Sequence, residues 1–367
     1  MRKLFRELHL WLSLPFGLLI MVTCFTGAML MFENEVTLLC NYRATFVVPD
    51  GRPLPIDVLV SSVKDILPED IDVTDVVVYP ENDRAYKVKL SAPKHAAMYV
   101  NQYTGEVTGD AGRLQFFRVM RHMHRWLMDD SRGKGGVFWG RLVVGTSTIA
   151  SVVILITGIV LWVPRSLSSL RNRLKIVATK GYSRFCYDLH VAGGFYVALL
   201  LLTMAVTGLT WSFSWYRNGF YALLGVEEVQ GIGRNRRGQE TVNSVEWPSN
   251  VWQRAYETVA ERNPGKLITV SKGRVAVAVG GLGNQEAVDC YTYNVDGDIV
   301  DELLYEDSGR LAKIRGWIYS LHVGSWGGLL MRVLYFLAAL FGATLPLTGY
   351  YMWFKTLLRN RGKRGRC

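Results

Sequence analysis

The chain has 367 residues, half of them hydrophobic, and a formal net charge of +11. The hydrophobic residues cluster in long runs, which excludes an ordinary soluble domain, and the five cysteines form no CxxC pair for thiol redox chemistry. The cationic excess lies in short segments beside the apolar runs, so it indicates membrane topology and not nucleic-acid binding.

Four apolar stretches are each long enough to cross a hydrocarbon layer of about 30 Å as a helix. The first is too long for the apolar part of a cleaved signal peptide, so we expect it to stay in the membrane. The predicted order is a membrane helix at 1–33, an exported domain at 34–112, a surface helix and loop at 113–136, a membrane helix at 137–164, a basic loop at 165–184, a membrane helix at 185–213, an exported domain at 214–316, a membrane helix at 317–354 and a basic tail at 355–367.

Basic residues without acidic neighbours mark one side of this membrane. Segments 165–184 and 355–367 each carry six Lys or Arg residues and no Asp or Glu. The positive-inside rule therefore puts both termini and the middle loop in the cytoplasm of a bacterial inner membrane, with the two larger domains in the periplasm. The lipid bilayer is the expected partner of these cations.

Each exported segment predicts one amphipathic helix followed by short strands and a tight turn. The first has a helix at 56–67, strands at 73–79, 85–90 and 97–100, and a turn at 101–107. The second has a helix at 250–262, strands at 267–270, 274–279 and 289–294, and a turn at 296–298. The predicted fold is thus an α-helical membrane protein with two small α+β domains. Cys40 and Cys290 both lie outside the predicted spans, where they could form a disulfide, although nothing in the sequence requires one.

The chain also reads as two copies of one plan, helix, exported domain, helix. His9 and His190 each precede a glycine by eighteen residues, and a threonine precedes that glycine in both halves. Small residues at such points let membrane helices approach closely. Each span carries one such pair: Thr26-Gly27, Thr157-Gly158, Thr207-Gly208 and Thr348-Gly349.

Histidines near the membrane boundaries are the strongest chemical signal. His9 and His190 lie near the cytoplasmic face, His322 begins the fourth span on the exported face, and His122 and His124 precede the second span there. Ionisable residues at such depths are costly and usually functional. Imidazoles from facing helices suit a bis-histidine haem, whereas zinc needs about four ligands and an iron–sulfur cluster needs clustered cysteines. We therefore predict two b-type haems, bound without covalent links because no CxxCH is present.

The exported ligand from the first half has two candidates. Residues 129–136 are too polar for lipid, so 114–127 must fold back as a surface helix. His122 and His124 are two apart and point to different faces of that helix, so only one can reach an iron, and we favour His124. Candidate cationic partners for haem propionates are Arg125, Arg141, Arg315 and Arg332 near the outer site, and Arg6 and Arg184 near the inner one.

Several motifs together resemble one family. They are Leu8-His9, His124-Arg125-Trp126-Leu127, Leu189-His190 and Leu321-His322-Val323-Gly324, with the Thr-Gly pairs and the strand and turn at 99–107. Over nearly its whole length the chain resembles the PepSY-associated transmembrane family, which includes bacterial ferric-siderophore reductases. The resemblance implies two haems stacked across the membrane, with His9 and His190 on the inner one and His124 and His322 on the outer one, and His122 as the alternative ligand.

The predicted function is a transmembrane electron conduit, a reductase that passes electrons to a periplasmic ferric siderophore for iron uptake. Gly231-Ile232-Gly233 lacks the third glycine and the setting of a dinucleotide-binding loop, so a separate cytoplasmic reductase or quinol would be the donor. One alternative is a membrane anchor for domains that bind peptides or restrain a protease, which gives no reason for histidines at both faces. The other is an iron-chelate transporter, for which the spans hold few carboxylates or helix breaks.

Overall fold

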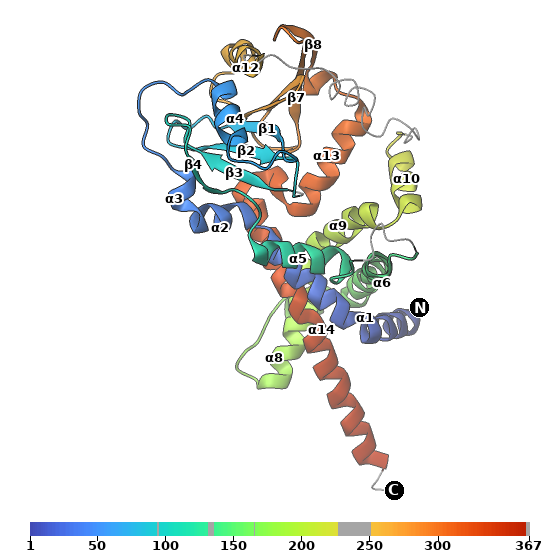
Figure 1. Cartoon of the computed structure of the whole chain (residues 1–367). Helices are drawn as coiled ribbons and strands as arrows, with labels where there is room; N and C mark the ends of the chain where they lie inside the picture. Colours follow the sequence, from blue (N-terminus) through green and yellow to red (C-terminus); the bar gives the residue numbers. More distant parts are fainter. Residues whose placement is uncertain (94, 131–135, 165, 227–250, 365–367) are drawn as a thin grey trace. The chain divides into compact units, whose positions relative to one another are not determined.

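The computed structural model describes residues 1–93, 95–130, 136–164, 166–226 and 251–364 (Figure 1). The chain divides into two compact units. The membrane unit contains residues 1–31, 116–225 and 318–367, and the sheet unit contains residues 32–115 and 226–317. The chain passes between the units at four points: 31–32 and 317–318 lie near predicted ends of spans, whereas 115–116 and 225–226 lie outside the predicted spans.

Among the described residues, four helices of the membrane unit are long and apolar enough to cross a membrane. They are α1 (Arg2–Leu30), α6 (Trp139–Trp162), a continuous third helix made of α8 (Tyr182–Asp188), the π-helical turn η1 (Leu189–Gly193) and α9 (Gly194–Ser212), and α14 (Gly328–Arg364). α1 packs against α6 and α14, and α9 packs against the same two helices. α1 and α9 therefore occupy opposite corners of the bundle. The short helices α7 (Leu167–Arg173) and α10 (Ser214–Leu223) flank the third helix.

The fourth span begins later and ends later than predicted. A separate helix, α13 (Arg310–Val323), stops at Gly324, and the short turn η3 (Ser325–Gly327) leads to Gly328, where α14 begins. Gly324 and Gly328 have φ of +71° and +65°, which side-chain-bearing residues rarely adopt, so the helix breaks there. His322 consequently lies on α13 and does not begin the fourth span. α14 continues to Arg364, ten residues past the predicted end of this span.

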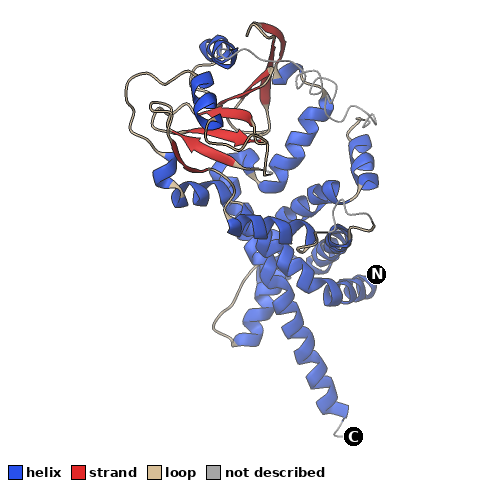
Figure 2. Cartoon of the chain, in the orientation of Figure 1, coloured by secondary structure: helices blue, strands red, loops and turns tan. Residues whose placement is uncertain are grey.

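The sheet unit is built on one antiparallel sheet of eight strands in the order β4-β3-β2-β1-β5-β6-β7-β8 (Figure 2). The two small domains predicted from the sequence share this sheet, because β1 pairs with β5 and Val76 lies opposite Val270. The edge strands β4 and β8 follow the predicted turns and were not themselves predicted. The bounds are β1 (Val73–Val78), β2 (Tyr86–Leu90), β3 (Ala97–Val100), β4 (Val107–Asp110), β5 (Ile268–Ser271), β6 (Arg274–Ala278), β7 (Val288–Tyr293) and β8 (Ile299–Leu303).

Two helices share the apolar core of this sheet, α4 (Ile56–Lys64) and α12 (Val251–Arg262). Each helix caps the other: Asp57 accepts hydrogen bonds from the backbone N–H groups of Trp252 (3.2 Å) and Gln253 (2.9 Å), and the Gln253 side chain accepts one from the Ile56 N–H (2.8 Å). These caps satisfy first-turn N–H groups that have no partner within their own helix. The remaining short helices of the unit are α2 (Glu33–Cys40), α3 (Tyr42–Thr45) and η2 (Tyr305–Asp307). Cys40 and Cys290 are free cysteines and do not pair.

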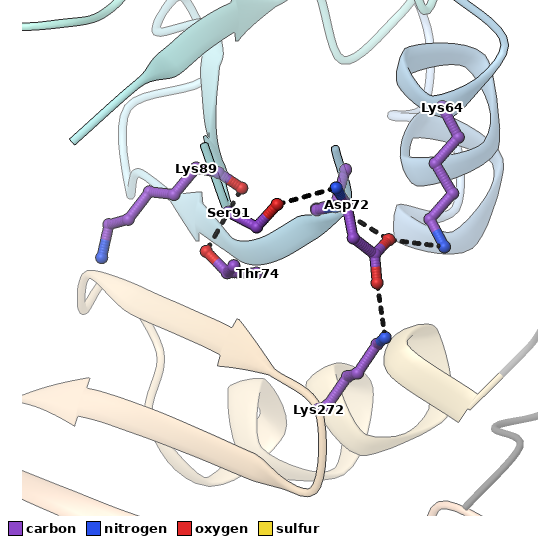
Figure 3. A network of polar contacts seen from close by, with 7 residues as sticks. Lys64, Asp72, Thr74, Lys89, Ser91 and Lys272 are labelled. Carbon is purple, nitrogen blue, oxygen red and sulfur yellow. Dashed lines mark hydrogen bonds and ion pairs between the residues drawn. The ribbon is translucent and has the colours of Figure 1, made fainter. Parts of the chain in front are cut away.

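Asp72 ties the two halves of the sheet unit together (Figure 3). Its carboxylate accepts a hydrogen bond from Lys272 Nζ at 2.7 Å and pairs with Lys64 Nζ at 2.8 Å, while its backbone N–H donates to Ser91 Oγ at 2.9 Å. Burial alone would raise the pKa of Asp72, but the hydrogen bonds and charges of Lys272 and Lys64 together outweigh burial and lower it. Folding is therefore stabilised by this carboxylate above its unfolded pKa, and the contribution is lost as the pH falls through the lower folded pKa.

Replacing Asp72 by asparagine is expected to lower the stability of the sheet unit at neutral pH by about 1 kcal/mol or less, because the ion pairs are partly exposed. The full chain in detergent would be tested by pulse proteolysis across a urea series, with Asp70→Asn at an exposed neighbouring carboxylate as control. The difference between wild type and Asp72→Asn should shrink as the pH falls below 4. A difference that stays constant with pH would contradict the linkage.

Candidate functional site

Two histidines meet inside the membrane unit from opposite corners of the bundle. His9 comes from α1, and His190 comes from the π-helical turn η1. Their ring centroids are 6.2 Å apart, and the ring planes are nearly perpendicular, at 89°. A π-helical turn inside a long helix often marks a functional position, and here it contains the ligand candidate itself. These two rings form the inner pair.

A second pair forms at the other end of the same unit. His124 on α5 (Gln115–Trp126) faces His322 at the end of α13, with ring centroids 6.3 Å apart and ring planes at 57°. His122 takes no part: its Nε2 lies 3.4 Å from Asp130 Oδ1, and its ring packs against Trp126. Of the two candidates, the structure therefore brings His124 to His322. These two rings form the outer pair.

The loop after α5 fixes that helix against the start of α6. Asp129 Oδ2 accepts a hydrogen bond from the Gly140 N–H at 2.7 Å, in the first turn of α6. A Cβ atom at Gly140 would come within 2.0 Å of the Trp126 carbonyl oxygen, so only glycine allows this approach. The fold-back predicted for residues 114–127 is thus held by backbone contact, and it presents His124 to the bundle.

The Nδ1 atoms of all four paired rings have the same kind of partner, a backbone carbonyl oxygen. In each case Nδ1 lies within hydrogen-bond distance of a backbone carbonyl, which can only accept, so Nδ1 carries the proton. The neutral ring then has an unprotonated Nε2 with a lone pair for a metal. The Nδ1 contacts are His9 to Ile154 O (3.0 Å), His124 to Thr23 O (2.9 Å), His190 to Leu345 O (3.1 Å) and His322 to Met204 O (2.9 Å).

A buried threonine hydroxyl supports each ring from the same helix turn. The threonine follows the accepting carbonyl by three residues, and its own hydroxyl donates to a carbonyl of its helix, as Thr157 does to Val153 at 2.8 Å. The hydroxyl oxygen is therefore free to accept from the ring N–H. The Nδ1 to Oγ1 distances are 3.2 Å for His9 and Thr157, 3.4 Å for His124 and Thr26, 3.0 Å for His190 and Thr348, and 3.1 Å for His322 and Thr207.

The glycine after each threonine lies against the ring, and at three of the four positions a Cβ atom would crowd the ring. A Cβ atom built on Gly27 would lie 2.9 Å from His124 Cε1, which is closer than Cβ atoms come to their neighbours. The corresponding distances to Cε1 are 3.2 Å at Gly158 for His9, 3.1 Å at Gly208 for His322 and 3.4 Å at Gly349 for His190. We call each Thr-Gly pair with its accepting carbonyl a ring seat. The Thr-Gly pairs were recognised in the sequence, but they were interpreted there as points of close helix packing.

The geometry of both pairs fits two axial ligands on one metal ion. An imidazole nitrogen bonds a metal at about 2 Å and lies roughly 1.1 Å from its ring centre, so two opposed ligands have ring centres about 6.3 Å apart. Within the described residues, no group of three or more His, Cys, Asp or Glu side chains could hold a metal ion. A macrocycle that carries its own iron would supply the remaining donors. A bis-histidine haem meets this requirement, and structural zinc does not.

Replacing Thr207 by valine removes the hydroxyl from one ring seat and keeps the shape of the residue. Loss of such a partner to a metal-bound histidine weakens metal binding by about 10- to 100-fold, so a haem held by the outer pair would be expected to dissociate at least tenfold faster. Transfer of haem to apomyoglobin measures this rate. Thr146→Val is the matched control, because Thr146 is exposed on α6 and its hydroxyl donates to Leu142 O. Equal rates in the two variants would show that the hydroxyl of Thr207 does not support the ring.

The arginines proposed as propionate partners have defined contacts. Arg332 donates to the Met31 carbonyl at the end of α1, and the Arg125 guanidinium lies 4.7 Å from the centre of the Trp126 ring. Arg184 pairs with buried Asp188 at 2.8 Å, and Arg6 lies 3.7 Å from Glu7. Propionate binding by any of them stays a prediction, as it does for Arg141, which is exposed on α6, and for Arg315, which belongs to the sheet unit.

One buried polar group close in sequence to His322 was not predicted. Ser325, three residues after His322, has a buried Oγ atom with no hydrogen-bond partner among the described residues. A buried hydroxyl without a partner is unusual in a folded protein. Gly231-Ile232-Gly233, examined as a nucleotide-binding signal, lies outside the described residues.

Comparison with known proteins agrees with this arrangement of spans. A family model described as the PepSY-associated TM region matches residues 6–356, nearly the whole chain. No curated protein matches the chain. The matched region contains both histidine pairs and all four ring seats. The four spans, the site at each end of the bundle and the extent of the match identify the chain as a membrane protein of the PepSY-associated TM family.

Proposed function

We propose that this protein carries electrons across a bacterial inner membrane through two non-covalently bound b-type haems and reduces ferric siderophores on the periplasmic side. One observation carries the proposal. The structure contains two histidine pairs, and the two ring centroids within each pair lie about 6 Å apart. The Nδ1 atom of every ring is hydrogen-bonded to a backbone carbonyl. This leaves Nε2 available on all four rings, which is what axial ligation of haem iron requires.

The origin of the ligands supports a tandem repeat of helix, exported domain, helix. α1, α5 and α6 supply His9, His124 and the seats for both. The third helix, α13 and α14 supply His190, His322 and the seats for both. Each pair thus takes one ring from each half of the chain. Each haem would lie between the halves, which explains why neither half alone contains a complete site.

The separation of the pairs supports conduction across the bilayer. On α1, His9 of the inner pair and Gly27, which seats the outer pair, are eighteen residues apart, or about 27 Å of helix at roughly 1.5 Å per residue. This is close to the thickness of the hydrocarbon layer, about 30 Å. The haems would supply reversible one-electron chemistry near each face. The protein's part is to hold the rings in one tautomer and orientation and to surround them with apolar helices.

Charge and chemistry suggest the direction and the substrate. Unopposed cations beside the inner pair favour a cytoplasmic location for that side, with a cytoplasmic reductase or quinol as donor. Ferric iron in a siderophore is the proposed acceptor, because reduction weakens its binding by hard oxygen donors. A membrane anchor for peptide-binding or protease-restraining domains gives no account of four ring seats, and an iron-chelate transporter gives none for histidines paired with free Nε2 atoms.

The test is single-turnover reduction of a ferric chelate. The purified full chain would be reduced with dithionite, freed of excess reductant and mixed with a ferric hydroxamate siderophore. Reoxidation of the haem bands should release ferrous iron, trapped by ferrozine, at close to one iron per electron. His322→Ala, which lacks the outer pair, should keep a reducible inner haem and release iron at least tenfold more slowly. Reoxidation without ferrous iron would contradict the proposed substrate.

The angles between the rings predict two different paramagnetic resonance signals. Perpendicular axial imidazoles leave the iron d orbitals nearly degenerate, so the inner pair, at 89°, should give a low-spin ferric signal with large anisotropy. The outer pair, at 57°, should give a less anisotropic one. Low-temperature spectra of the oxidised protein measure both, and His322→Ala should remove only the second. A single rhombic signal accounting for two haems would contradict these orientations.

A further inference from the structure

One aromatic side chain outside the two histidine pairs lies against a paired ring. Trp211 on α9 contacts His322, with ring centroids 5.1 Å apart and ring planes at 70°. Within the described part of the chain, His9, His124 and His190 contact no aromatic ring other than that of the paired histidine. The outer pair therefore has an aromatic neighbour that the inner pair lacks.

The position of Trp211 follows from the ring seat of His322. Thr207 supports this ring, and residue 211 lies four residues later, one turn further along the same face of α9. The residues at the same spacing after the other three seat threonines carry no aromatic ring: Leu30, Leu161 and Met352. Trp211 is thus an exception within the internal repeat, at a position where the helix face directs it to the seated ring.

The two pairs also differ in the angle between their rings. The inner pair, whose seats are followed by Leu161 and Met352, has ring planes at 89°. The outer pair, in which Trp211 lies against one ring, has ring planes at 57°. All four rings have the same kind of hydrogen bond at Nδ1, so these bonds do not account for the difference. The contact with Trp211 is a feature that does distinguish the outer pair.

Packing between aromatic rings gives this contact a preferred orientation. The faces of aromatic rings are negative and their edges positive, so such pairs favour edge-to-face arrangements like that of Trp211 and His322. A hydrogen bond weakens steeply only when its angle falls below about 120°, so the bond at Nδ1 leaves the plane of a seated ring some freedom to turn. A turn of the His322 ring would disturb its packing on the indole. The indole therefore restricts the plane of this ring more than the seat does.

Anchoring at a membrane boundary does not explain the contact with His322. Tryptophan is common at such boundaries, and Trp211 is 42% exposed near the end of the third span. Trp215, four residues later and 65% exposed, is equally suited to anchoring. Among the described residues, however, the Trp215 ring contacts the rings of Phe213 and Tyr216 and no histidine. Trp215 therefore offers a natural control for anchoring without ring contact.

We propose that Trp211 is a positioning residue for the outer pair: its indole holds the plane of the His322 ring away from the perpendicular arrangement of the inner pair. This rests on the proposed function, in which His322 is an axial ligand. The d orbitals of a ferric haem iron respond to the planes of its axial imidazoles. Trp211 thus makes the two irons electronically different, although all four ligands have the same kind of seat.

The test is the low-temperature paramagnetic resonance spectrum of the oxidised, haem-loaded full chain. Trp211→Leu gives this position the side chain that the first half has at Leu30. The less anisotropic signal of the outer pair should shift towards that of the inner pair, with a larger highest g value and unchanged haem content. Trp211→Phe keeps an aromatic ring and should retain the wild-type signal. Trp215→Leu should change neither signal, and the inner signal should be constant in all variants.

An outer signal that is the same in wild type and Trp211→Leu would overturn the proposal, as would an equal shift in Trp215→Leu. If wild type gives no low-spin haem signal, the proposed function fails first. Nuclear magnetic resonance of histidine-labelled full chain then tests the positioning role without haem, with His322→Ala to assign the resonances. The indole ring current should displace the ring-proton resonances of His322, and Trp211→Leu should remove this displacement. Unchanged His322 resonances in Trp211→Leu would overturn the positioning role.

Discussion

Replacing His124 by alanine is expected to remove one of the two proposed haems from the purified protein, whereas replacing His122 should leave both in place. His124 lies 6.3 Å from His322 between ring centroids and has its Nδ1 bound to the Thr23 carbonyl. His122, on the same helix, contacts Asp130 and Trp126 instead. The haem content per chain, from the pyridine haemochrome spectrum, should fall from about two to about one in His124→Ala only.

The comparison of these neighbours separates ligation from folding. Both side chains lie on α5 and both are partly buried, so a general loss of the helix would affect the two variants alike. His322→Ala should reproduce the loss seen with His124→Ala, and His9→Ala or His190→Ala should remove the other haem. Loss of both haems from each single variant, in protein that remains monodisperse on size exclusion, would contradict the pairing.

Valine at Gly27 is expected to empty the outer pair without changing a ligand. The Cβ atom alone would meet His124 Cε1 at 2.9 Å, and the two γ-methyl groups add bulk on a stiff side chain, so the ring must leave its seat. Because α1 also carries His9, an intact inner haem reports that the helix is still in place. The expected result is about one haem per chain, with only the strongly anisotropic resonance signal remaining.

The matched control for this variant is Gly219→Val. Gly219 lies in the helix α10, and a Cβ atom there would meet nothing within 4 Å. This change should leave both haems bound and both signals unchanged. If Gly27→Val also keeps two haems with unchanged signals, the ring seat is not needed for binding, and the contact at Gly27 is ordinary helix packing.

The spans and the pairing of the histidines were readable in the sequence because each has a local signature. Apolar runs predict membrane helices whatever their partners, and unopposed cations predict a side of the membrane. The positions of His9, His124, His190 and His322 near the ends of the spans predicted paired ligands, and the structure brings the same four rings into two pairs. Their role as haem ligands stays a prediction that only bound haem can decide.

The features that were missed depend on contacts between distant segments. The partner of every ring is a backbone carbonyl, which any residue has, so the seats leave no trace beyond Thr-Gly. The joined sheet depends on β1 and β5, nearly two hundred residues apart in the chain, and pairing of that kind has no local pattern. The break before α14 was hidden because apolar residues continue across Gly324 and Gly328, where hydropathy does not register backbone conformation.

The central claim is that two pairs of imidazoles each bind one haem iron. The most direct measurement is the visible spectrum of the purified full chain, oxidised and dithionite-reduced, together with its iron content. The account predicts sharp reduced bands of six-coordinate b-type haem and about two irons per chain. Acid acetone should extract both haems intact, because no covalent bond links them to cysteine. A folded protein that is colourless and free of iron, and that still binds no haem when haem is added, would contradict the central claim.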